Sequence, residues 1–253
     1  MKAILLACVL TCAAAAQQAA EAPPILQIVR KPGTRIPPGR RYASAGAAVN
    51  VLGMSAITGD EETWLVECHQ SFDSIELLDR ALAAFGQQAP AEDVAPARTL
   101  IAFYRPGWSY RAEQAVRMLP RSHYFHVTIY RIHSGEEADF GELIKARRLN
   151  LDSVNLDRPD LAYQVVSGAV SGTYIFIAPL TSLRTMDDAV ATLPYYAESV
   201  ANPRAKEAEK ISQRLEVSRE HLLLRVEPRF SFVSDDFAEA EPEFWRGKPA
   251  ESR

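Results

Sequence analysis

One face of a short alternating stretch carries the side chains with the clearest capacity for chemistry. Apolar and polar residues alternate over positions 124–131, which predicts a strand with two differently used faces. The polar face carries Tyr124, His126, Thr128 and Tyr130. Tyrosine and histidine can orient a planar phenolic or quinone-like ligand and move protons near neutral pH. His126, with Tyr124 or Tyr130, is therefore the candidate for catalysis.

Other polar residues could complete a ligand-binding site around this face. Tyr163 and Tyr174 are candidate neighbours from later strands, and Glu67 and His69 occupy the matching strand of the first half of the chain. Tyrosine and histidine are also common in ordinary cores, with their polar tips bonded to each other or to water. These residues could therefore belong to a plain interface between two sheets, and both interpretations stay open.

The sequence predicts no metal site and no cofactor. His123 and His126 stand three residues apart on a strand, so they point to opposite faces and cannot bind one ion together. Cys68 is separated in the same way from its two neighbours in sequence, and we expect it to be a buried apolar thiol. The chain contains no glycine-rich phosphate loop and no nucleophile elbow.

A helix should follow the alternating stretch. Ser134 and Glu137 have the spacing of a capping box, which predicts a helix that begins at Gly135 and ends near Val154. We expect the polar face of the strand to line the space between two sheets. The opposite, apolar face is expected to pack on helices and carries Phe125, Val127 and Ile129.

The same order of elements occurs twice along the chain. Strands are predicted at 25–30, 48–57, 63–69 and 98–105 in the first half, with a helix at 74–85. The second half repeats the order β-α-β-β-α-β, whereas in the first half a proline-rich loop replaces the first helix. The alignment of the halves pairs Gly33 with Gly135, Gly59 with Gly172, and Pro106 with Pro228.

We therefore predict an α+β fold in which two tandem ferredoxin-like β-α-β-β-α-β units form a pseudo-dimer within one chain, an α+β barrel whose first unit lacks a full first helix. The sheets would cover each other's bare faces. The predicted boundaries are a signal peptide at 1–16, a disordered linker at 17–24, a first unit at 25–110, a connecting helix and linker at 111–123, a second unit at 124–233 and a C-terminal tail at 234–253.

The segment YRIHSGEEADF, residues 130–140, resembles the strand, turn and helix start of the NIPSNAP-like group within the dimeric α+β barrel superfamily. The resemblance covers the second half of the chain well, and the first half keeps only Lys31, Pro32 and Gly33 of the pattern. It implies a pair of sheets with a cavity between them. It implies no single activity, because the superfamily includes cofactor-free oxygenases, isomerases and haem-handling proteins.

The N-terminus has the features of an export signal. Lys2 precedes an apolar run, and Ala14, Ala15 and Ala16 offer a cleavage site. We expect an exported protein, periplasmic or extracellular. An alternative is a lipoprotein anchored through Cys12, although the threonine before this cysteine fits that signal poorly.

Composition excludes several classes of partner. The net charge is −4 and no cluster of basic and aromatic residues occurs, so nucleic acid is not an expected partner. The apolar runs are too short for a permanent membrane span. After cleavage Cys68 would be the sole cysteine, which excludes an internal disulfide.

These observations favour a non-catalytic protein that binds a small hydrophobic or aromatic ligand or acts as a scaffold. The alternative is a cofactor-free oxygenase or isomerase acting on an aromatic small molecule, with His126 as general base and a tyrosine stabilising the developing oxyanion. Haem binding is a third hypothesis, which an absorption spectrum would test. The sequence leaves the ligand and the oligomeric state open.

Overall fold

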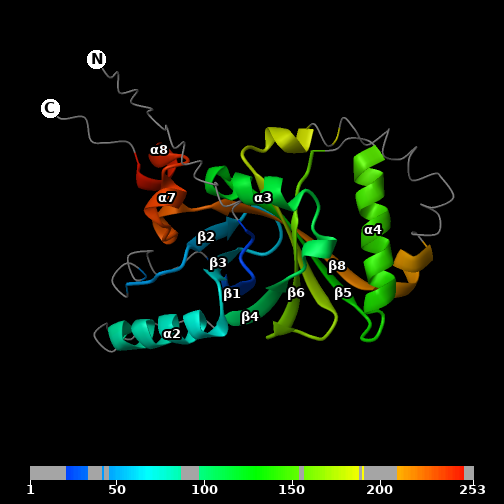
Figure 1. The fold of residues 1–253 in the computed structure, drawn as a ribbon, viewed down its shortest axis with the longest axis horizontal. Helices are drawn as coiled ribbons and strands as arrows, with labels where there is room; N and C mark the ends of the chain where they lie inside the picture. Colours follow the sequence, from blue (N-terminus) through cyan, green and yellow to red (C-terminus); the bar gives the residue numbers. More distant parts are fainter. Residues whose placement is uncertain are drawn as a thin grey trace, which may run out of the picture.

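Eight antiparallel strands close into a barrel in the computed structural model (Figure 1). The structure describes residues 21–33, 42, 46–86, 97–153, 157–187, 190 and 210–247. The order of hydrogen-bonded strands around the barrel is β1-β3-β2-β8-β5-β7-β6-β4. Closure pairs every strand on both sides, so the sheet has no free edge.

Each half of the chain contributes four neighbouring strands in the same order. The first unit contains β1 (Ile25–Pro32), β2 (Val51–Ala56), β3 (Glu62–His69) and β4 (Arg98–Tyr104), with helix α2 (Phe72–Gly86). The second contains β5 (Tyr124–Ile132), β6 (Leu161–Ser167), β7 (Thr173–Leu180) and β8 (Glu216–Val226), with helix α4 (Glu137–Ser153). In both units the fourth strand pairs with the first, the first with the third, and the third with the second.

The predicted pseudo-dimer of ferredoxin-like units is confirmed by this strand order. The units join twice, through β2 with β8 and through β4 with β6. Figure 1 shows α2 and α4 on opposite sides of the barrel. Residues 34–41 and 43–45, which include part of the predicted proline-rich loop, lie outside the described residues, as do residues 191–209 of the second unit.

The residues paired by the sequence alignment occupy equivalent places in the two units. Gly33 and Gly135 follow the first strand of each unit, with φ of 75° and 95°. Gly59 and Gly172 lie in the two hairpin turns, with φ of 83° and 78°. Such left-handed conformations favour glycine, which has no Cβ. The prolines begin the short 3-10 turns η1 (Pro106–Trp108) and η3 (Pro228–Phe230), which follow the fourth strands.

Apolar side chains fill the barrel interior. One buried cluster draws on all eight strands, among its members Leu26, Leu52, Trp64, Leu100, Phe125, Leu161, Ile175 and Leu224. The apolar face of β5, with Val127 and Ile129, therefore points into the barrel, and the polar face points outward towards the helices. The predicted orientation of this strand is wrong. Inside a closed barrel there is no water to solvate polar tips, so the apolar face is the one that turns inward.

The two ends of the barrel are closed by different chemistry. Helix α3 (Ala112–Met118) connects the units, and its Ala115 and Val116 are buried in the interior cluster. At the opposite strand ends, Arg30 bonds Glu62 at 2.9 Å and Glu220 at 3.2 Å, and Arg131 bonds Glu220 at 3.0 Å. This charged network joins strands of both units, because Arg30 and Glu220 lie on different halves of the chain.

Helix α4 begins two residues later than the capping pattern predicts. Its first residue is Glu137, and Gly135 belongs to the preceding turn because its φ of 95° is incompatible with a right-handed helix. In that turn the backbone amide of Glu136 donates to the carbonyl of His133, and the amide of Phe140 donates to the carbonyl of Glu136. Glu136 thus occupies the boundary position expected for Ser134.

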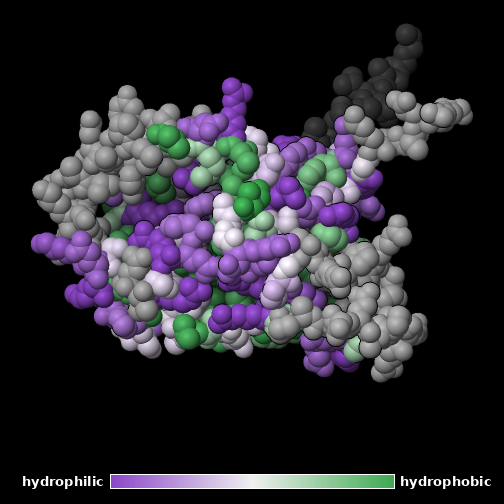
Figure 2. Space-filling view, turned by 180° about the vertical axis from the view of Figure 1, so that it is seen from behind, coloured by the Kyte–Doolittle hydropathy of each residue, from purple (hydrophilic) through white to green (hydrophobic). Residues whose placement is uncertain are grey.

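Both chain ends of the described barrel pack on it. Residues 21–24, which the sequence assigns to a disordered linker, lie against the barrel: Pro23 accepts a hydrogen bond from the Tyr163 hydroxyl, and Pro24 one from the Tyr104 amide. The tail forms α7 (Asp235–Ala238) and α8 (Pro242–Arg246), and the Trp245 indole donates to Pro120 at 2.7 Å. None of the helices in the described ranges is long and apolar enough to span a bilayer. Seen from behind, hydrophilic residues cover most of the described surface (Figure 2).

Candidate functional site

The candidate polar residues fall on the outer faces of the two units. In the first unit, Glu67 and His69 lie on the face of β3 that packs beneath α2, with 3% and 0% of their surfaces exposed. In the second, Tyr124, His126, Thr128 and Tyr130 lie on the face of β5 that points towards α4. The structure therefore separates these predicted site residues into two groups on opposite sides of the barrel, and Tyr163 belongs to neither, because it lies in the interior cluster.

The group in the first unit is a closed hydrogen-bond network. The Tyr42 hydroxyl donates to Glu67 Oε1 at 2.9 Å, and Glu67 Oε2 lies 3.3 Å from His69 Nε2. His69 Nδ1 lies 3.0 Å from Ser74 Oγ, at the start of α2. The Ser74 hydroxyl itself donates to the carbonyl of Ser71 at 2.7 Å.

This network has the residue types of a nucleophile relay but the wrong direction of proton donation. Because the Ser74 proton is directed at Ser71, Nδ1 of His69 must donate to the Ser74 oxygen, and His69 cannot accept the serine proton. The remaining ring nitrogen then shares a proton with Glu67. Each of these side-chain polar atoms has a hydrogen-bond partner, so the network anchors α2 on the sheet.

The group in the second unit centres on two histidines. His126 on β5 and His221 on β8 have nearly parallel rings, with centroids 5.6 Å apart and planes 20° apart. Thr128 Oγ1 lies 3.2 Å from His221 Nδ1. His126 is half-buried, Thr128 is buried and His221 is exposed, so a molecule in solution can reach the imidazole pair.

Two arginines outside the predicted set stand beside these histidines. Arg147 of α4 bonds the carboxylate of Asp160 at 2.7 Å and stacks over Phe176 at 5.6 Å. Asp160 is 2% exposed at its side chain, and its other oxygen accepts from the amide of Tyr110 at 3.1 Å. Arg158, in the segment between α4 and β6, donates to the sulfur of Met186 at 3.6 Å.

These charges set the protonation of His126. The pKa of His126 is lowered from 6.5 to about 4, first by burial and then by the positive charges of Arg158, His221 and Arg147, in that order. The pKa of Arg158 is also lowered, first by burial and then by Arg147, and Asp160 opposes the change. At neutral pH His126 is therefore an uncharged imidazole within a positively charged surrounding.

The predicted tyrosines take structural positions. Tyr163 lies in the barrel interior, on the opposite side of the sheet from His126. Tyr130 and Tyr174 belong to an aromatic cluster beneath α4, where the Tyr174 ring stacks on Phe140 at 4.8 Å. The Tyr174 hydroxyl is buried without a hydrogen-bond partner in the part of the chain that the structure describes, and burial raises its pKa. Tyr124 is half-buried at the start of β5.

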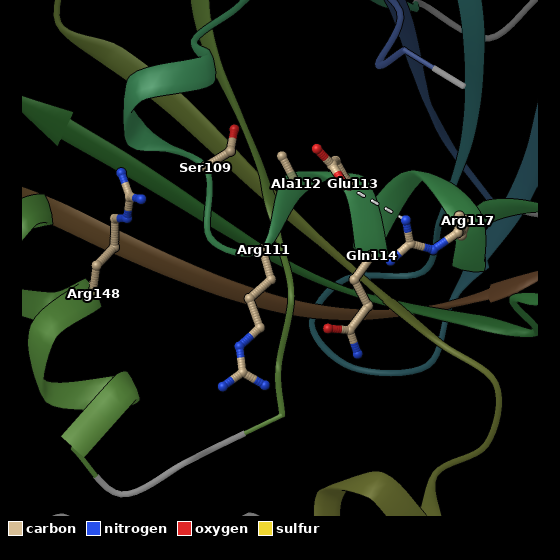
Figure 3. Close-up of a pocket in the computed structure, with 7 residues that line it drawn as sticks. All are labelled: Ser109, Arg111, Ala112, Glu113, Gln114, Arg117 and Arg148. Carbon is tan, nitrogen blue, oxygen red and sulfur yellow. Dashed lines mark ion pairs between the residues drawn. The ribbon is translucent and has the colours of Figure 1, made fainter. Parts of the chain in front are cut away.

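A polar cleft of about 420 Å³ lies beside α3 (Figure 3). It is lined by Ser109, Arg111, Ala112, Glu113, Gln114, Arg117 and Arg148. Each of its arginines has a partner: Arg111 bonds Asp157 at 3.2 Å, Arg117 lies 3.7 Å from Glu113, and Arg148 donates to the carbonyl of Gly107. Two of the three arginines of the cleft are thus paired with acids, and the third with a backbone carbonyl.

The described residues contain no group of three or more histidine, cysteine or acidic side chains able to hold a metal ion. His123 stacks on Phe244 with ring centroids 4.1 Å apart and bonds Glu241 at 3.0 Å, away from His126. Cys68 faces the barrel interior, and burial first and Glu67 second raise the pKa of its thiol to about 12. This thiol is therefore not reactive at neutral pH.

Sequence reasoning missed His221, Arg147 and Arg158. His221 lies in β8 and Arg158 in the segment between α4 and β6, and neither stands in a sequence motif that points to chemistry. Their proximity to His126 depends on which strands pair, which no local pattern reveals. The alternation of β8 could have placed His221 on an outer face, but not beside Thr128.

No protein-family model matches the chain, and no curated protein matches it in sequence. Solved structures share the general fold at low similarity. A presumed monooxygenase from Lactobacillus acidophilus is 11% identical, with 83% of this chain and 99% of that chain covered and a TM-score of 0.47. An anthrone oxidase-like protein is 10% identical, covering 81% and 92%, with a TM-score of 0.47. A chlorite dismutase variant from Candidatus Nitrospira defluvii in complex with cyanide is 11% identical, covering 88% and 96%, with a TM-score of 0.46. Likeness at this level carries no argument about activity.

Proposed function

We propose that this chain binds a small planar aromatic molecule on the outer face of the second unit, against His126 and His221. The observation that supports the proposal is the accessible pair of nearly parallel imidazoles, 5.6 Å apart, with the charge of Arg147 acting on His126. Flat rings stack favourably on such surfaces, and arginine beside them adds attraction to a π-system. The barrel interior is filled by apolar side chains, so the ligand site lies outside it.

Isothermal titration calorimetry with 2-naphthamide, a neutral planar probe, tests this proposal. We expect His126→Leu to weaken binding about fivefold through loss of stacking, because ring contacts contribute about 1 kcal/mol. His133→Gln is the matched control, since His133 is exposed in the turn after β5. Equal affinity in wild type and His126→Leu would contradict the placement of the site.

A cofactor-free oxygenase or isomerase is the second candidate. It is supported by His126, which is uncharged at neutral pH and so able to accept a proton. The same low pKa, about 4, makes the imidazole a weak base, because general-base catalysis is most effective when the pKa lies near the working pH. Binding without chemistry is therefore the better supported function. Turnover of an aromatic substrate that is lost in His126→Gln would reverse this order.

The N-terminal residues support a proposal about location. The basic, apolar and small-residue pattern of positions 1–16 is that of a cleaved signal peptide, and a site for a small diffusible ligand suits a protein exported to the periplasm or medium. From the likeness of residues 130–140, we also propose a relation to the NIPSNAP-like group. N-terminal sequencing of the mature protein tests cleavage after Ala16 against lipid modification at Cys12.

A further inference from the structure

We propose that the ligand of the second unit carries a carboxylate, and that Arg158 binds this group while the aromatic ring rests on the histidine pair. The inference rests on the proposed function and adds the chemical class of the ligand. It begins with an imbalance of charge beside His126. Among the described residues, the charges of two guanidinium groups, those of Arg147 and Arg158, act on His126, and the carboxylate of Asp160 bonds the first of them.

Both oxygens of Asp160 are engaged by groups other than Arg158. One of its oxygens accepts from Arg147 at 2.7 Å, and the other accepts from the amide of Tyr110 at 3.1 Å. These contacts hold the segment before β6 against α4 and against the connection between the units. Asp160 is therefore a structural carboxylate, and it makes no direct ion pair with Arg158 among the contacts of the described residues.

Arg158 makes a weak contact, although a guanidinium can form strong hydrogen bonds with a carboxylate. Its one hydrogen bond within the described ranges goes to the sulfur of Met186 at 3.6 Å, and a thioether is a poor acceptor. No carboxylate of the described residues lies within ion-pair distance of it. A half-buried guanidinium presents a planar fork of donors that matches a carboxylate in two parallel hydrogen bonds.

The neighbouring groups favour the same ligand chemistry. Arg158 stands two residues before Asp160, which bonds Arg147 at 2.7 Å, and Arg147 lies over the ring of Phe176, the strand partner of Thr128. The positive charges of Arg158 and Arg147 also lower the pKa of His126, so the surrounding potential is positive. His221 adds a second ring, and the hydroxyl of Thr128 already bonds it at 3.2 Å. An aromatic carboxylate would neutralise Arg158 with its acid group and cover the imidazoles with its ring.

Calorimetry with 2-naphthoate and 2-naphthamide, which differ in charge and share a ring, tests the inference at pH 7. We expect wild type to bind 2-naphthoate at least tenfold more tightly than 2-naphthamide. Arg158→Met should lose this preference by weakening 2-naphthoate about tenfold and leaving 2-naphthamide within twofold. Arg158→Lys should fall between the two, because a lysine offers charge without the planar fork.

Arg80→Met is the matched control, since Arg80 carries the same charge on the exposed surface of α2 and pairs only with Glu76. Its affinities should equal those of wild type. If wild type and Arg158→Met bound both probes with equal affinity, the inference that the ligand carries a carboxylate would be wrong. The proposed aromatic site would still be supported. Failure of both probes to bind wild type would overturn the proposed function together with this inference. The thermal midpoint of Arg158→Met confirms folding, and Arg158→Lys repeats the test if that variant is unstable.

Discussion

The outer faces of the two units carry similar residue types and use them differently. In the first unit Tyr42, Glu67, His69 and Ser74 satisfy one another completely beneath α2. In the second unit His126 and His221 are accessible, and Arg158 forms no ion pair with an acid of the described residues. A satisfied polar network anchors a helix, whereas an accessible ring pair beside a guanidinium is open to a ligand.

The comparison also shows why strand order alone does not define a site. Both units have the same order of four strands, and both place a histidine on the outer face. The difference lies in the acid that accompanies it: Glu67 bonds His69, whereas Asp160 is engaged by Arg147. If this interpretation is correct, substitutions in the first unit should change stability, and those in the second should change binding.

The largest expected effect is that of Glu67→Ala. Removal of this carboxylate takes away the acceptor of the Tyr42 hydroxyl bond and the bonding partner of a buried ring nitrogen of His69. The free energy of unfolding, measured by urea denaturation, should fall by about 3–4 kcal/mol, which is the usual loss when a buried polar network is broken.

Glu67→Gln is the conservative control, because an amide oxygen can still accept from Tyr42. It should cost about 1 kcal/mol. Affinity of either variant for 2-naphthoate should stay within twofold of wild type. A loss below 1 kcal/mol in Glu67→Ala, or a loss of ligand affinity in the folded variant, would remove the distinction between the two faces.

Asp160→Asn should have the next largest effect, and it should change both the stability of the fold and the affinity for 2-naphthoate. Arg147 loses its buried acid, while the amide of Tyr110 keeps an oxygen acceptor, so the free energy of unfolding should fall by about 2 kcal/mol. The positive potential rises at the same time, and 2-naphthoate should bind a few-fold more tightly. Asp157→Asn, at an exposed position paired with Arg111, should change stability by less than about 0.5 kcal/mol. Weaker binding in Asp160→Asn would show that Asp160 contacts the ligand instead.

The pH dependence of stability should distinguish the two histidine sites further. Because the pKa of His126 falls from 6.5 to about 4 on folding, the unfolded chain binds more protons between these values, and acid favours unfolding there. The penalty is absent above about pH 6.5 and complete below about pH 4. Allowing for partial exposure, it should reach about 1–2 kcal/mol. Urea denaturation of His126→Gln from pH 7 to 4 should show a shallower decline than wild type by this amount, and an unchanged slope would contradict the burial of His126.

Much of the fold was predictable because its signals are local. Alternation located the strands, hairpin turns with glycine separated them, and the repeated order indicated two ferredoxin-like units. The start of α4 was misplaced by two residues, since the capping pattern does not reveal that Gly135 has a positive φ. Alternation also shows that two faces of β5 differ, but not which one turns inward when a sheet closes.

The candidate site was predictable only in part, because it is assembled by closure of the sheet. His126 and Thr128 were found on one strand face, but Tyr163 proved to lie inside the barrel. Arg147 and Arg158 come from a helix and a connecting segment whose positions depend on packing. The sequence therefore identified one strand of the site, and the charges that distinguish it from the first unit required the structure.

The smallest expected change in stability is that of Arg158→Met, and its small size is informative. If the guanidinium stabilised the fold, its removal would lower the free energy of unfolding by at least about 1.5 kcal/mol, as for other buried hydrogen-bonded ions. Arg158 bonds only a sulfur in the described structure and is repelled by Arg147, so methionine should leave the free energy of unfolding within about 0.5 kcal/mol of wild type or raise it slightly. Urea denaturation checks this, with Arg80→Met as the surface control. Near-wild-type stability combined with lost affinity for 2-naphthoate would separate a binding residue from an anchoring one, and a clear loss of stability would place Arg158 with the network of Glu67.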